Sequence, residues 1–170
     1  MNVAIEKFVP LVDLGVITVP EDHRLATFGR ENRGQFFHYE EAINDKNFSN
    51  PTHVLKSGDK LGVHAFRQVV PSATTSEERL EFCRKQKGNV FVGAQGASLV
   101  FKQKRNQLPR GLWYGSLDQR ERLWKDARGC YGVPNLVALR GGDWDFDLRC
   151  FEQPRDDSYA FFAFRDLSGS

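Results

Sequence analysis

The sequence predicts a single α+β domain in which two helices precede a strand-rich C-terminal half. Its 170 residues suffice for one hydrophobic core. Hydrophobic residues make up 40% and charged residues 27%, as in ordinary globular proteins. Beyond Pro109 the pattern changes from helical spacing to short β-type runs separated by Gly, Pro and Asp. We therefore expect two helices packed on a small, mainly antiparallel sheet.

The first 50 residues show little periodicity and several turn residues, so we expect an irregular segment, with one short helix at most, packed on a domain formed by residues 51–170. Glu6 and Lys7 interrupt the opening residues, which predicts no signal peptide and a cytoplasmic or virion-associated protein. No apolar run approaches the roughly 18 residues of a membrane span, so we expect no membrane insertion.

The middle of the chain supplies both expected helices. Residues 61–70 are rich in β-formers and predict a strand. Thr75 to Glu78 fits a capping box, and Gly88 is a stop signal, which predicts a helix over residues 76–87. A short strand at 89–92 and a second helix at 94–106, with a basic outer side, complete this part.

Four β-type runs follow, at residues 112–115, 135–139, 146–151 and 159–164. Charge divides the chain unevenly: residues 102–128 hold 8 basic and 3 acidic side chains, whereas residues 129–170 hold 4 and 7. The overall net charge of +2 argues against a protein that binds nucleic acid by neutralising phosphates. We therefore do not expect a nucleic-acid partner.

Common motifs of catalysis and cofactor binding are absent from the sequence. The segment 93–96 lacks the lysine or third glycine of a phosphate loop, and Ser116 lacks a nucleophile elbow. The four histidines show no metal-ligand spacing, so we expect no metal, no cofactor and no catalysis. Three cysteines without a CxxC pattern favour free thiols, and these residues are Cys83, Cys130 and Cys150.

Asp143, Asp145 and Asp147 alternate like the start of a calcium loop. The continuation fails, because Leu148 and Pro154 stand where such a loop needs Gly and Glu. We interpret the three aspartates as a solvated acidic strand edge beside arginines such as Arg140 and Arg149.

The C-terminal region combines packing residues with residues that packing does not explain. Arg140-Gly141-Gly142-Asp143-Trp144 allows a tight turn beside a large aromatic, and Ala163-Phe164-Arg165 ends a phenylalanine-rich run. These pieces resemble the C-type lectin fold in its formylglycine-generating-enzyme-like form, and in particular the variable proteins of diversity-generating retroelements. The resemblance implies a fixed scaffold that carries a diversified, calcium-independent ligand-binding surface at about residues 130–165.

The scaffold motif implied by this resemblance comprises Gly141, Gly142, Trp144, Phe164 and Arg165. The candidate variable, ligand-binding positions are Tyr131, Asn135, Val137, Arg140, Asp143, Phe146, Arg149, Cys150, Gln153, Arg155, Ser158 and Tyr159. Gln153 is a weak member, since changes at the adenines of an asparagine codon do not reach glutamine. Tyr, Arg and Phe suit recognition because they supply much binding energy per position. The expected partner is a protein or cell-surface ligand.

Two other hypotheses stay open at this point. One is an enzyme of the same fold with cysteines or histidines assembled in space, although the family's paired catalytic cysteines have no counterpart in sequence. The other is a nucleic-acid or inhibitor protein that works through a basic patch comprising Lys102, Lys104, Arg105, Arg120 and Arg122. Such a patch would bind with steep salt dependence.

Overall fold

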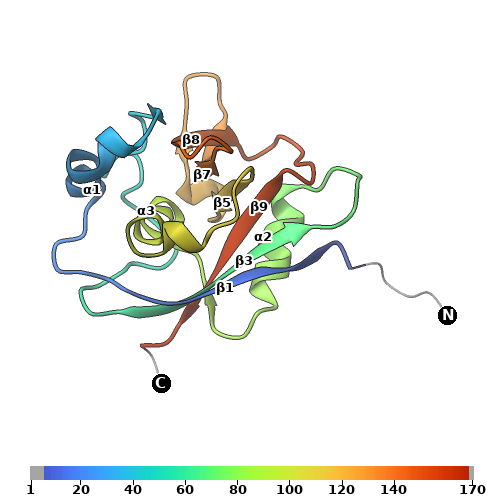
Figure 1. Ribbon diagram of the computed structural model, residues 1–170, viewed down its shortest axis with the longest axis horizontal. Helices are drawn as coiled ribbons and strands as arrows, with labels where there is room; N and C mark the ends of the chain where they lie inside the picture. The colour runs from blue at the N-terminus through green and yellow to red at the C-terminus, as the bar shows by residue number, and fades with distance from the viewer. Residues whose placement is uncertain (1–5, 169–170) are drawn as a thin grey trace.

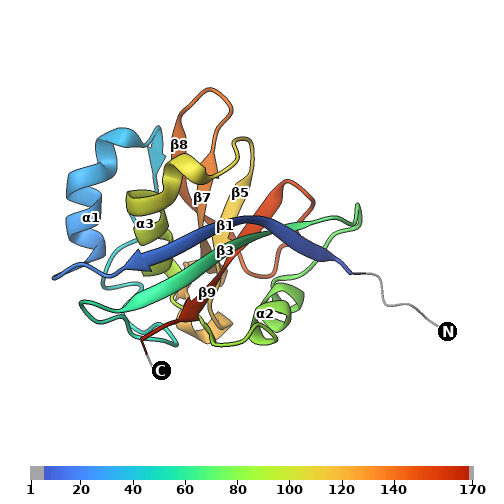
Figure 2. The same cartoon turned by 60° about the horizontal axis from the view of Figure 1, so that its bottom comes forward.

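One mixed sheet runs through the molecule, and helices cover parts of both its faces (Figures 1 and 2). The computed structural model describes residues 6–168. Its strands are β1 Phe8–Thr18, β2 His38–Tyr39, β3 Lys60–Gln68, β4 Asn89–Val90, β5 Trp113–Ser116, β6 Trp124–Lys125, β7 Tyr131–Ala138, β8 Trp144–Cys150 and β9 Tyr159–Asp166. Its α-helices are α1 Leu25–Asn32, α2 Ser76–Arg84 and α3 Gly93–Lys104.

The strand order of the sheet is β1-β3-β9-β5-β7-β8-β2, with β4 paired to β9 and β6 to β7. Most pairs are antiparallel, but β5 runs parallel to β9 and β2 runs parallel to β8. The last strand of the chain therefore lies in the middle of the sheet, between β3 and β5. The α+β class with a mainly antiparallel sheet and a strand-rich C-terminal half is confirmed.

The N-terminal segment is more regular than its sequence indicates. The expectation that residues 1–50 are irregular is wrong for most of residues 6–50, the part of this segment that the structure describes. Strand β1 pairs with β3 along its length, and α1 is the one short helix that the expectation allowed. The register of β1 shifts between Pro10 and Val12 and again between Asp13 and Gly15. These bulges break the period of two by which a strand is found in a sequence.

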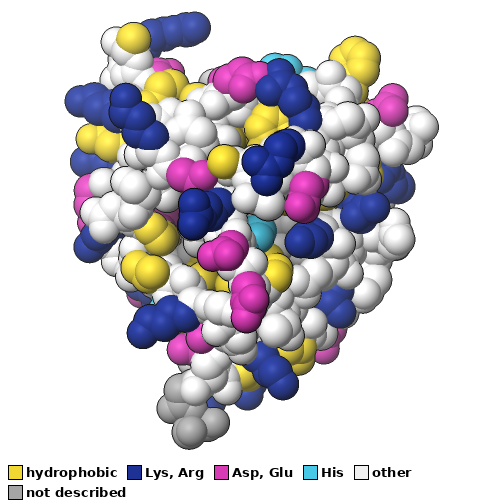
Figure 3. Space-filling model, turned by 90° about the vertical axis from the view of Figure 1, so that its left-hand side faces the viewer, with side chains coloured by type: hydrophobic (Ala, Val, Ile, Leu, Met, Phe, Trp, Pro, Cys, Tyr) yellow, Lys and Arg dark blue, Asp and Glu magenta, His cyan; other side chains and the backbone are white. Residues whose placement is uncertain are grey.

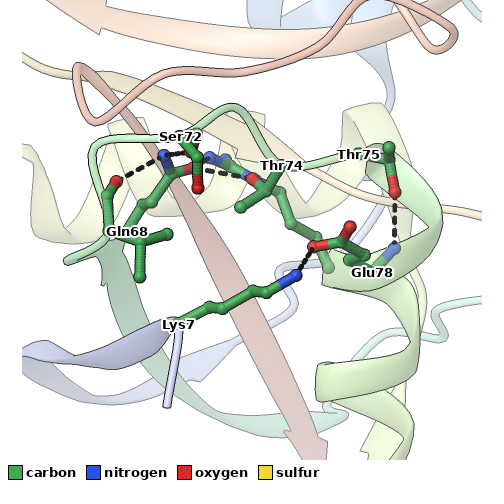
Figure 4. Close-up of polar contacts among 8 residues, drawn as sticks. Lys7, Gln68, Ser72, Thr74, Thr75 and Glu78 are labelled. Carbon is green, nitrogen blue, oxygen red and sulfur yellow. Dashed lines mark hydrogen bonds and ion pairs between the residues drawn. The ribbon is translucent and has the colours of Figure 1, made fainter. Parts of the chain in front are cut away.

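The predicted elements of the middle segment are confirmed to within a few residues. Thr75 caps α2 by accepting a hydrogen bond from the Glu78 backbone N–H at 3.1 Å (Figure 4). The Glu78 carboxylate does not return to the cap as a capping box requires; it pairs with Lys7 Nζ at 3.0 Å. The first turn of α2 is thereby tied to the segment that leads into β1.

Helix α2 packs on one face of the sheet, which we call the α2 face, whereas α1 and α3 pack on the other (Figures 1 and 2). The α1 and α3 side holds large aromatic contacts, such as Phe28 with Phe146 at 5.9 Å. Gly96 lets α3 approach β9 closely, because a Cβ there would lie 2.7 Å from Phe164 Cζ.

The longest α-helix within residues 6–168 has 12 residues, too few to traverse a lipid bilayer. Residues 1–5, which carry most of the opening segment from which we predict the absence of a signal peptide, lie outside the described residues. The same holds for Gly169 and Ser170 at the end of the printed sequence.

Candidate functional site

The α2 face is divided into a covered half and an open half. In the covered half, Phe8 and Phe66 from β1 and β3 and Phe161 from β9 pack against Phe82 of α2, with ring centroids 4.8–5.8 Å apart. The open half lies over β5, β7 and β8. Strand register places Tyr159, Trp113, Val137 and Asp145 in one row across it.

The open half is defined by the side chains of Trp113, Asp145, Asp147, Arg149 and Tyr159. Asp145, Asp147 and Arg149 alternate along β8, so their side chains lie on the same face of the sheet. This arrangement is the acidic strand edge beside an arginine that the sequence predicts. Asp143 precedes β8 and lies in the exposed turn between β7 and β8.

Three of these residues form an arginine–aromatic cluster, which consists of Trp113, Arg149 and Tyr159. The Trp113 and Tyr159 rings lie 5.4 Å apart, and the Arg149 guanidinium lies 4.1 Å from the centre of the Trp113 ring. Arg149 Nη2 is also 3.5 Å from Asp147 Oδ2. The Arg149 Nε is buried and has no hydrogen-bond partner within residues 6–168. The cluster is half-exposed and held in place by cation–π and ionic contacts.

Strand β7 forms the floor of the open half. Because β7 lies between β5 and β8, the Arg149 side chain passes over it to reach Trp113. Val133, Asn135 and Val137 face the same side of β7 and are buried. The Asn135 amide donates to the Val133 carbonyl at 3.0 Å.

Four of the candidate ligand-binding positions are buried, and the expectation that they face a ligand is wrong for them. Asn135 and Val137 belong to the floor, and Phe146 points to the opposite face, where it packs on Phe28. Arg155 is 4% exposed and holds the loop 151–158 together: it donates to the Cys150 carbonyl at 2.7 Å and the Gln153 carbonyl at 2.8 Å. Burial lowers the pKa of Arg155.

The other candidate positions are exposed or half-exposed, but only Arg149 and Tyr159 meet in the cluster. Arg140 and Asp143 lie in the β7–β8 turn, and Gln153 and Ser158 lie in the loop that leads to β9. Tyr131 begins β7, where the Arg120 guanidinium lies 5.3 Å from its ring centre.

Three residues of the scaffold motif, Gly141, Gly142 and Trp144, lie in the β7–β8 turn and at the start of β8, whereas Phe164 and Arg165 lie in β9. Gly142 has a φ of +99°, a conformation that favours glycine. Trp144 is buried against Phe101 of α3 at 5.3 Å and is capped by the Arg110 guanidinium at 4.5 Å. Of the two other motif residues, Phe164 is buried and Arg165 is exposed.

The expectation of free thiols is wrong for two of the three cysteines. Cys130 and Cys150 form a disulfide, with Cα atoms 5.4 Å apart. The register of β7 and β8 explains the pairing, because Gly132 lies opposite Cys150 and Cys130 lies just before β7. Cys83 is free and buried, and burial raises its pKa to about 12. Its thiol is therefore a poor nucleophile at neutral pH.

Two of the five residues of the basic-patch hypothesis make polar contacts within the chain. Arg105 donates to the Phe101 carbonyl at 3.1 Å, and Arg120 lies 3.5 Å from Glu152. On the side of the molecule where α1 lies, Lys and Arg side chains are interspersed with Asp and Glu (Figure 3). That side offers no continuous basic surface for a phosphate backbone.

Sequence reasoning missed Trp113 as a member of the site. The sequence assigns it to a strand, but only the parallel pairing of β5 with β9 brings it beside Tyr159. Comparison with known proteins found no matching family model, no matching curated protein and no matching solved structure.

Proposed function

We propose that this protein is a ligand-recognition protein whose open half binds a protein or cell-surface ligand. The observation that carries the proposal is the arginine–aromatic cluster: a half-exposed Trp, Tyr and Arg held against one another on a rigid sheet. These three residue types dominate binding energy at protein interfaces. A side chain that is already ordered loses little conformational entropy on binding.

We further propose that the scaffold is C-type lectin-like and that its surface is diversified. Two features support this proposal. Helices α2 and α3 lie on opposite faces of the sheet and precede its strand-rich end, and the Arg140–Trp144 segment forms the turn that opens β8. The proposed variable surface then excludes the four buried positions and retains the exposed ones.

Substitutions in the cluster test the binding proposal. Ligand is enriched from a surface extract of source cells on immobilised protein, and retained proteins are quantified by mass spectrometry for the wild type, Arg149→Ala and Tyr159→Ala. We expect each substitution to weaken retention of the same ligand at least tenfold while the protein stays folded, with Tm lowered by no more than a few degrees. Arg67→Ala is the matched control, because Arg67 is an exposed arginine of the same sheet outside the open half. Equal retention by all three variants would refute the proposal.

Sequencing of the locus in a population of source cells tests diversification separately. We expect adenine-templated changes at half-exposed positions such as Arg149, Ser158 and Tyr159, and none at the buried Phe146 or Trp144. An invariant locus would leave the binding proposal standing and reject diversification.

A further inference from the structure

A histidine and two carboxylates converge at the β2 edge of the open half. His38, Glu40 and Asp147 each offer one ligand atom, and these three atoms all lie within 4.8 Å of one another. His38 Nε2 and Asp147 Oδ1 lie 3.8 Å apart. His38 is exposed and both carboxylates are half-buried, so solvent reaches the group.

The backbone of two strands fixes this convergence. In the parallel pair of β2 and β8, His38 lies opposite Asp145, and its backbone N–H donates to Asp145 Oδ1 at 3.1 Å. The Glu40 N–H continues the pairing by donating to the Phe146 carbonyl at 2.8 Å. His38 and Glu40 are two residues apart, so they face the same side as Asp147. The side chains therefore start from a sheet rather than from a loop.

The donor atoms that remain available have the chemistry of a metal site. Asp147 Oδ2 lies 3.5 Å from Arg149 Nη2, which leaves Oδ1 toward His38. That oxygen accepts the Leu148 N–H at 2.9 Å and retains a second lone pair. One imidazole nitrogen with two carboxylates suits Zn²⁺ and similar ions, whereas Ca²⁺ prefers six to eight oxygens.

We propose that His38, Glu40 and Asp147 bind a divalent transition-metal ion of the Zn²⁺ class. Zinc bonds to nitrogen and oxygen of about 2.0–2.2 Å require the three atoms to close in slightly, which side-chain rotations supply. Three protein ligands leave at least one position of a tetrahedral ion open to solvent. This site goes beyond the recognition function and does not depend on it.

Calorimetric titration of the full chain with Zn²⁺ alone tests the proposal. We expect one ion per chain and an affinity at least tenfold lower for each of His38→Ala, Glu40→Gln and Asp147→Asn. Glu40→Gln preserves shape, so it remains informative if His38→Ala unfolds, which circular dichroism would reveal.

His64→Ala is the matched control. His64 Nε2 lies 3.7 Å from Asp13 Oδ1, a comparable exposed pair that no third ligand atom joins within residues 6–168. We expect this variant to bind Zn²⁺ like the wild type. Absence of saturable binding at millimolar Zn²⁺, or equal losses in His38→Ala and His64→Ala, would overturn the proposal.

Cobalt gives a spectroscopic readout of the same site. We expect Co²⁺ to produce visible absorption bands that are lost in Glu40→Gln and unchanged by millimolar Ca²⁺. Displacement of Co²⁺ by Ca²⁺ would overturn the assignment to a transition metal.

Discussion

The two halves of the α2 face use the same kinds of residue for opposite purposes. In the covered half, aromatic rings surround the buried Arg79, which donates to Thr74, to Gln68 and to the Tyr159 carbonyl at 3.1–3.2 Å. In the open half, Arg149 lies on Trp113 and remains 35% exposed. Burial lowers the pKa of Arg79 to about 9. An arginine beside aromatic residues in the sequence can therefore belong to the core or to the surface. Which of the two applies depends on whether a helix covers that part of the sheet.

The largest expected effect compares an aromatic from each half. Phe161→Ala should lower the free energy of unfolding by about 3–5 kcal/mol, because it removes a fully buried ring that contacts Phe8 and Phe82. Trp113→Ala should cost clearly less, because Trp113 is half-exposed. Urea unfolding measures both variants. Equal losses would mean that the open half is as much a part of the core as the covered half.

The disulfide is expected to stabilise the β7–β8 pair, which supplies the floor and one side of the open half. Replacing both Cys130 and Cys150 with Ser should lower the free energy of unfolding by about 3 kcal/mol, because the loop that they close no longer restricts the unfolded chain. Urea unfolding with and without reductant measures this effect. Reductant should destabilise the wild type by a similar amount and leave the double variant unchanged. An unaffected wild type would contradict the prediction.

A smaller effect contrasts the two arginines. Arg79→Ala should cost about 2–3 kcal/mol, since it removes three hydrogen bonds and the packing of the side chain on Phe161. Arg149→Ala should cost under about 1 kcal/mol, as half-exposed ionic contacts contribute little. Thermal and urea unfolding should agree on this order. A reversed order would remove the distinction between the halves.

The smallest expected effect is that of protonating His23, which lies beside α3 on the face opposite the α2 face. Burial, and secondarily Lys102, lower the pKa of His23, whose Nε2 lies 2.8 Å from Ser98 Oγ. The unfolded chain then binds more protons, so the free energy of unfolding should fall as pH decreases from above 6.5 toward the lowered pKa. His23→Gln should reduce this dependence in urea unfolding at several pH values. The surface substitution His64→Gln is the control, and an unchanged profile in His23→Gln would contradict the prediction.

The sequence predicted the elements with strong local signals. The cap at Thr75 and the stop at Gly88 identify α2, and the β-forming residues of the segment 61–70 identify β3. The sequence did not predict strand β1, because two bulges break its period. It did not predict the Cys130–Cys150 bridge, because this pairing depends on the register of β7 and β8. Local patterns carry helix ends and turns, whereas register is a property of the assembled sheet.

The candidate site was predicted in part for the same reason. Arg149 and Tyr159 were found because their residue types lack a packing role in the sequence. Phe146 was assigned to the surface on the family resemblance, although its place between Asp145 and Asp147 puts it on the opposite face of β8 from those carboxylates, where it is buried. Trp113 and His38 join the open half through parallel pairs with β9 and β8, and long-range parallel pairing has no local signature.

The central position of β9 also determines when the protein can fold during synthesis. The hydrogen-bonded ladder from β3 to β5 passes through β9, which leaves the ribosome after the other described strands of the sheet. Until residues 159–166 emerge, the β1–β3 pair and the β5–β7–β8 group lack the strand that joins them. Until then Phe66 lacks Phe161 and Tyr114 lacks Phe162, so this interval is the period of greatest exposure to aggregation and to chaperones.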